Sequence, residues 1–147
     1  MKLFIFLVIL SAFMQTSFVP LNLCLILIIS RSYALPTKSN YYLALFGGLL
    51  VGLLSVYNLG FYPLIFLSAV FCIQIIRGLP FTNHFFTVIP VSFLILSITL
   101  WSENFFLNIP VNYWSGLIGS LLCLPIFLVI RQFEDSFVVK KGIKLKV

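Results

Sequence analysis

The segment from residue 41 to residue 77 constrains the fold most strongly. It contains two apolar runs, and only the short break Tyr57-Asn58-Leu59-Gly60 separates them. A bilayer hydrocarbon core about 30 Å thick is crossed by a helix of roughly 20 predominantly apolar residues. The first run is rich in glycine, and the second ends at Arg77. This pattern predicts a transmembrane helical hairpin with the other apolar segments packed around it.

The rest of the chain is similarly apolar. Of its 147 residues, 62% are hydrophobic and only 8% are charged, whereas soluble domains are about 25% charged. Strands of membrane barrels alternate apolar and polar residues, but runs such as FIFLVIL and LCLILII do not alternate. Helices satisfy their own backbone hydrogen bonds in lipid. We therefore expect an all-α integral membrane protein with about six transmembrane helices.

The expected helices follow from the apolar runs and the breaks between them. Pro20 suits the first position of a helix, and Pro90 is expected to kink the fifth span. The first run resembles a signal peptide, but Phe13 is too bulky for the cleavage site, so we expect an uncleaved span. The whole chain, 1–147, is expected to be one domain, with spans at 3–18, 21–35, 41–56, 61–76, 85–100 and 111–130 and a basic cytoplasmic tail at 131–147.

The charges indicate the orientation of these spans. Six spans place both termini on one side, and a cytoplasmic N-terminus then places all nine basic residues in the cytoplasm, as the positive-inside rule requires. They are Lys2, Arg31, Lys38, Arg77, Arg131, Lys140, Lys141, Lys144 and Lys146. Arg31 is expected to extend its guanidinium to the lipid headgroups. Because the basic residues are scattered between apolar runs, the net charge of +6 does not indicate a nucleic-acid partner.

Small residues form two strips that suit close helix packing. Gly48 and Gly52 form a GxxxG pattern in the third span, and Ser115 and Gly119 form a similar strip in the last span. Small residues let the backbones of membrane helices approach one another. We expect packing within the protein rather than a dimer face, and the two strips could face each other.

No set of residues indicates catalysis. His84 is the only histidine, and Cys24, Cys72 and Cys123 lie singly in apolar runs, which fits neither a metal site nor a disulfide framework. Glu103 is the only acidic residue before the tail; we place it at an outer boundary, where it need not be buried. The spans then contain no ionisable group well inside, which argues against an ion-coupled pump. We expect no enzyme activity, cofactor or metal.

Four short segments carry a family resemblance, which covers the chain at the level of span layout. They are Pro20-Leu21-Asn22-Leu23, the basic loop from Arg31 to Lys38, the glycine segment 48–54, and Leu59-Gly60-Phe61-Tyr62-Pro63-Leu64. In this layout the sequence resembles the rod shape-determining protein MreD family. Asn22 stands where that family often has an aspartate. The acidic residue that the family has soon after its glycine segment is missing here, and Ser55 and Asn58 stand near its place.

The resemblance implies a function and a set of partners. It implies a non-catalytic membrane scaffold subunit of the bacterial cell-elongation complex, which organises cell shape and peptidoglycan synthesis from the cytoplasmic membrane. The implied partners are an MreC-like protein and, through it, a cytoskeletal filament and wall synthases, besides membrane lipid. In the outer loops, possible partner-binding residues are Tyr57, Asn58, Gly60, Glu103 and Asn108.

Two other functions remain open. The family is similar in fold to the substrate-binding S components of energy-coupling-factor vitamin transporters, which would imply solute uptake. Polar residues of the outer loops, such as Asn104 and Asn112, could then line a pocket. The third alternative is a structural membrane subunit of some other complex.

Overall fold

The computed structural model describes residues 2–17, 21–55, 60–78, 87–108, 110 and 112–143, with the backbone alone at 2, 3 and 134–143. These residues form α-helices and no strand. The helices are α1 (Lys2–Ser17), α2 (Leu23–Ala34), α3 (Ser39–Leu54), α4 (Phe61–Arg77), α5 (Val88–Leu107) and α6 (Tyr113–Ile143). The predicted all-α class with six helices is confirmed.

Two of these helices are long and apolar enough to cross a membrane. They are α5 and the first part of α6, Tyr113–Phe133. The other four are apolar but shorter, and α2 has only 12 residues, which corresponds to about 18 Å of helix. By length and composition alone, the described residues thus contain two candidate spans and four shorter apolar helices.

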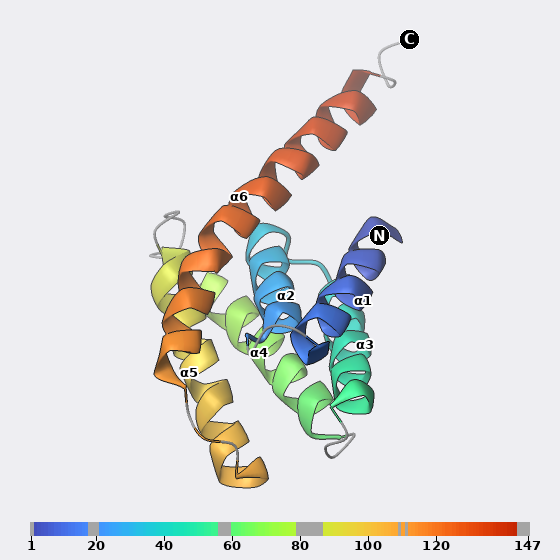
Figure 1. Ribbon diagram of the computed structural model, residues 1–147. Coiled ribbons are helices and arrows are strands. Elements are labelled where there is room, and N and C mark those ends of the chain that lie inside the picture. The colour runs from blue at the N-terminus through green and yellow to red at the C-terminus, as the bar shows by residue number, and fades with distance from the viewer. Residues whose placement is uncertain are drawn as a thin grey trace.

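The short helix α2 occupies the centre of the bundle. Among the described residues, it contacts all five other helices, and Figure 1 shows it between them. Leu25, Ile26 and Ile29 on α2 are fully buried, as are Phe66 on α4 and Val51 on α3. Apolar residues cover most of the circumference of α2, and this is typical of a helix that is enclosed by others.

The helices form two groups around α2. Helices α1, α3 and α4 pack against α2 and against one another in the pairs α1–α3 and α3–α4, whereas α5 packs mainly against α6. Figure 1 shows successive helices running in alternating directions, so that α1 begins and α6 finishes at the same end of the molecule. We call this the terminal end and the other the opposite end.

Several helix boundaries differ from the sequence-based expectations. Helix α5 runs to Leu107 instead of ending near residue 100, because Phe105 and Phe106 continue the apolar run past Glu103. It ends at Asn108, whose left-handed φ of 53° and hydrogen bond to the Asn104 carbonyl (3.1 Å) form a helix C-cap.

The prolines of the two long helices, Pro90 and Pro125, occupy different environments. Pro90 lies in the first turn of α5, where a missing backbone N–H leaves no helical hydrogen bond unmade. The kink expected at Pro90 therefore has no basis. Pro125 does lie inside α6, and this helix continues beyond Ile130 to Ile143. Its last turns extend past the other helices (Figure 1).

Candidate functional site

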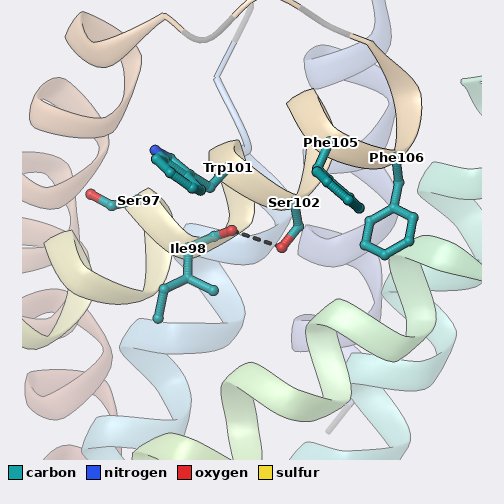
Figure 2. Close-up of a pocket in the computed structure, with 6 residues that line it drawn as sticks. All are labelled: Ser97, Ile98, Trp101, Ser102, Phe105 and Phe106. Carbon is teal, nitrogen blue, oxygen red and sulfur yellow. Dashed lines mark hydrogen bonds between the residues drawn. The ribbon is translucent and has the colours of Figure 1, made fainter.

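An open groove follows one side of α5. It has a volume of about 420 Å³ and is lined by Ser97, Ile98, Trp101, Ser102, Phe105 and Phe106. Figure 2 shows that all six residues come from α5 and that the Phe106 ring extends toward α4. The side chains of Trp101 and Phe105 are 70% and 78% exposed. The groove is therefore a large aromatic surface that no other described part of the chain covers.

A narrower continuation of the groove lies between α4 and α5. It has a volume of about 60 Å³ and shares Ile98 and Ser102 with the open part. The remaining lining residues are Ile65, Ser68, Ala69, Cys72, Ile95 and Thr99. Of all helix pairs in contact among the described residues, α4 and α5 share the smallest contact. The narrow part is thus lined from both helices, whereas the open part is a surface of α5 alone.

The hydroxyl groups in the groove are already hydrogen-bonded to their own helices. Ser102 Oγ donates to the Ile98 carbonyl at 2.8 Å, as Figure 2 shows. In the narrow part, Thr99 Oγ1 donates to the Ile95 carbonyl and Ser68 Oγ to the Ile65 carbonyl, at 2.9 and 2.7 Å. No charged residue lines either part. The groove therefore offers small and aromatic apolar surface, which suits another apolar segment or a hydrocarbon chain.

Polar contacts attach both ends of α5 to the central helix. At the opposite end, Asn22 Nδ2 donates to Glu103 Oε1 at 3.1 Å. At the terminal end, the Tyr33 and Thr87 hydroxyls share a hydrogen bond of 2.6 Å. Asn22 is the N-cap residue of α2, and Thr87 is the N-cap residue of α5. Helix α5 is thus held at its two ends, while its middle borders the groove.

Glu103 is buried, contrary to the expectation from the sequence. Its residue is only 7% exposed, because α5 continues past it and brings it against the start of α2. Gln15 on α1 completes the contact: its Nε2 donates to Asn22 Oδ1 at 2.8 Å, and its Oε1 accepts the Cys24 backbone N–H at 3.2 Å. Glu103 is therefore part of a polar chain that joins α1, α2 and α5.

A second polar cluster joins α2 and α3 near the terminal end. Arg31 is 5% exposed, and its Nη1 donates to Asn40 Oδ1 at 2.7 Å. Asn40 Nδ2 in turn donates to the Leu35 carbonyl at 2.6 Å. The guanidinium also lies 4.6 Å from the centre of the Phe4 ring on α1, which is a cation–π distance. The expectation that Arg31 reaches the headgroups was wrong, because Asn40 and Phe4 hold its side chain inside the bundle.

The two small-residue strips lie in different contacts. Gly48 and Gly52 are buried on α3, and a Cβ atom built on Gly48 would lie 2.5 Å from Pro63 Cα on α4. Gly119 is buried on α6, and a Cβ atom there would lie 3.0 Å from Leu96 Cδ1 on α5. Ser115 is partly buried, and its hydroxyl donates to the Asn112 carbonyl at 2.6 Å. Because α3 and α6 have no contact among the described residues, the two strips do not face each other.

The possible partner-binding residues are dispersed. Gly60 and Asn108 are exposed, Glu103 is buried, and Tyr57 and Asn58 lie outside the described residues, as does His84. Glu103 therefore cannot offer its carboxylate to an external partner in this arrangement. The described residues contain no group of three His, Cys, Asp or Glu side chains arranged to hold a metal ion.

The groove is the feature that the sequence did not predict. The large side chains from Ile98 to Phe106 stand in an apolar stretch, and such a stretch gives no sign of how far α4 and α5 separate. The only local signal is the alternation of Ser97, Ser102 and the aromatic residues along one face.

Compared with known proteins, the chain matches no family model, no curated protein and no solved structure.

Proposed function

We propose that this protein is an integral membrane subunit of MreD type, which acts as a non-catalytic scaffold in the bacterial cell-elongation complex. The observation that carries the proposal is the uncharged groove beside α5, with its exposed aromatic wall. Helices in lipid associate through close packing of small and apolar side chains. A groove of this chemistry suits an apolar transmembrane segment of a partner, such as that of an MreC-like protein.

The arrangement of the helices supports six membrane crossings with both termini in the cytoplasm. Successive helices alternate in direction (Figure 1), so Arg31, Lys38 and Arg77 all lie near the terminal end of the bundle. Basic residues favour the cytoplasmic side of a membrane. Helix α2, with 12 residues, is shorter than the bilayer core is thick. Its contacts with all five other helices mean that it is surrounded mainly by protein and not by lipid.

The alternative function, solute uptake by an S component, has less support from the same residues. Such a site needs converging polar groups around an open pocket. Gln15, Asn22 and Glu103 do converge at the opposite end, but they hydrogen-bond to one another and Glu103 is buried. The exposed groove, in contrast, contains no charged side chain.

The decisive test is purification of the tagged protein from native membranes, followed by identification of the proteins that co-purify. We expect an MreC-like protein and wall-synthesis components. The substitution Ile98→Trp, which fills the groove, should lower their recovery several-fold. Phe6→Trp is the matched control, because Phe6 is similarly exposed on α1 and lies outside the groove. Recovery of an ATPase pair with a large membrane coupling subunit, or of a bound vitamin, would overturn the scaffold proposal.

Membrane orientation is tested separately with reporter fusions. A reporter fused after Lys38 should be cytoplasmic, and reporters fused after Asn58 and after Asn108 should be external. A cytoplasmic signal after Asn58 contradicts the six-span arrangement. These fusions are read without any partner, so they distinguish an error in topology from an error in the partner.

A further inference from the structure

The position of α5 depends on few contacts with the rest of the bundle. Apart from its extensive packing against α6, α5 has only small contacts with α2 and α4 among the described residues. Side-chain contacts at its opposite end include the Asn22–Glu103 hydrogen bond and the Phe61–Phe106 ring pair, whose centres are 5.6 Å apart. Because the contact between α4 and α5 is small, we expect these end contacts to influence where the Glu103 end of α5 lies.

The Asn22–Glu103 hydrogen bond has a defined direction. Gln15 Nε2 donates to Asn22 Oδ1, so the Asn22 amide group must direct its Nδ2 toward Glu103. Asn22 itself is fixed at the N-terminus of α2, where its carbonyl accepts the Ile26 backbone N–H at 3.0 Å. A buried acceptor such as Glu103 Oε1 loses its donor if α5 moves away, and an unmade bond in a buried site is costly.

We propose that the Gln15–Asn22–Glu103 chain is a latch that positions the Glu103 end of α5 and thereby sets the width of the groove between α4 and α5. Glu103 is a positioning residue: it does not line the groove, but it lies next to Ser102 and two residues before Phe105, which do. Loss of the hydrogen bond releases the Glu103 end of α5 from α2 and lets that end move away from α4, while the Tyr33–Thr87 bond and the packing of α6 on α2 hold the rest. The inference rests on the proposed role of the groove, whose width decides which segment fits.

The test compares two substitutions of Glu103. Glu103→Gln keeps an oxygen acceptor for Asn22 and nearly the same shape, whereas Glu103→Leu removes the acceptor. Spin labels on L53C in α3, which packs closely against α4, and F105C in α5 measure the distance between the α3–α4 pair and α5 by electron paramagnetic resonance. Cys72 is replaced by Ser because it is exposed, while Cys24 and Cys123 are buried. Both labelled positions are exposed, and the measurement needs no partner protein.

We expect Glu103→Gln to keep the parental distance distribution and Glu103→Leu to give a longer mean distance and a broader distribution. A second label pair, L53C with L64C, lies within α3 and α4 and should be unchanged by either substitution. An unchanged L53C–F105C distance in Glu103→Leu overturns the latch, as does an equal change in the L53C–L64C pair, which indicates general loosening.

A further variant covers the case in which Glu103→Leu does not fold. Asn22→Ala removes the donor from a partly buried position and should lengthen the same distance. If Asn22→Ala folds without that change, or if neither variant folds, the latch is rejected in favour of a purely structural role. A longer distance with unchanged recovery of the co-purified partners would support the latch and count against the groove's proposed function.

Discussion

The two glycine strips illustrate two different kinds of helix contact. A Cβ atom on Gly48 would lie 2.5 Å from Pro63 Cα and 2.6 Å from Pro63 N, so α3 and α4 touch backbone against backbone. A Cβ atom on Gly119 would lie 3.0 Å from Leu96 Cδ1 and 3.1 Å from Ile26 Cδ1, which are the flexible ends of side chains. The same residue type thus marks a rigid contact on α3 and an adjustable contact on α6.

This difference separates the contact between α3 and α4 from the contacts of α5 and α6. Helices α3 and α4 share the most extensive contact among the described helices, while α4 and α5 share the smallest. Polar contacts follow the same division: Arg31–Asn40 joins α2 to α3, and Asn22–Glu103 joins α2 to α5. We therefore expect substitutions on the α3–α4 side to affect global stability more than substitutions on the α5 side.

The largest effect is expected for Gly48→Ala. The added methyl group meets the backbone of Pro63, which cannot move without shifting the start of α4. Overpacking of this kind costs typically 1–3 kcal/mol, and we expect a loss of about 3 kcal/mol here. The measurement is the free energy of unfolding in mixed micelles during titration with a denaturing detergent.

Gly60→Ala is the matched control for this prediction. Gly60 is the N-cap residue of α4, with a φ of −86°, and a Cβ atom there would have no neighbour within 4 Å. It should therefore leave the free energy of unfolding unchanged within about 0.5 kcal/mol, as expected for an exposed substitution. Equal losses in both variants would contradict the backbone contact between α3 and α4.

A smaller loss is expected for Asn40→Ala. Asn40 is 1% exposed and accepts a hydrogen bond from the Arg31 guanidinium, and a hydrogen bond to a charged group contributes about 1.5–3 kcal/mol. We expect a loss of about 2 kcal/mol in the same unfolding experiment. Ser39→Ala is the control, because its contact with Arg31 is long, at 3.5 Å. If Ser39→Ala costs as much as Asn40→Ala, the Arg31–Asn40 bond does not dominate this cluster.

The sequence predicts the helices better than the contacts between them. Apolar runs and the breaks between them locate α1 to α4 to within a few residues, because both signals are local. The burial of Glu103 is not local: its donor Asn22 lies 81 residues earlier in the chain. Asn22 also stands at a helix start, where its side chain would ordinarily be expected to cap the helix, yet here it makes no capping bond.

The groove was unpredictable for a related reason. Its narrow part lies between α4 and α5, and the side chains that line it come from residues far apart in the chain, such as Ile65 and Ile98. Arg31 shows the same limit, since a long basic side chain near a helix end can reach either water or a buried amide. The positions of Asn40 on α3 and of Phe4 on α1 decide between the two.

On the α5 side, Phe106→Ala should have a moderate effect. The Phe106 ring lies 5.6 Å from the Phe61 ring and 5.1 Å from the Phe105 ring, centre to centre. Aromatic pairs of this kind contribute about 0.5–1.5 kcal/mol beyond burial, so we expect a loss of about 1 kcal/mol. A double-mutant cycle with Phe61→Ala isolates the pair. A coupling energy near zero would show that this ring pair does not join α4 to α5.

The smallest effect is expected for Gly119→Ala, and it sharpens the comparison of the two glycines most directly. The added methyl group meets Leu96 Cδ1 and Ile26 Cδ1, and both side chains can adjust by a few tenths of an ångström. Alanine is favoured over glycine in a helix interior by about 0.8–1.0 kcal/mol, which offsets the cost of that adjustment. We therefore expect a net change within about 0.5 kcal/mol in the unfolding experiment. A loss as large as that of Gly48→Ala would mean that α6 also packs rigidly against α5 and α2.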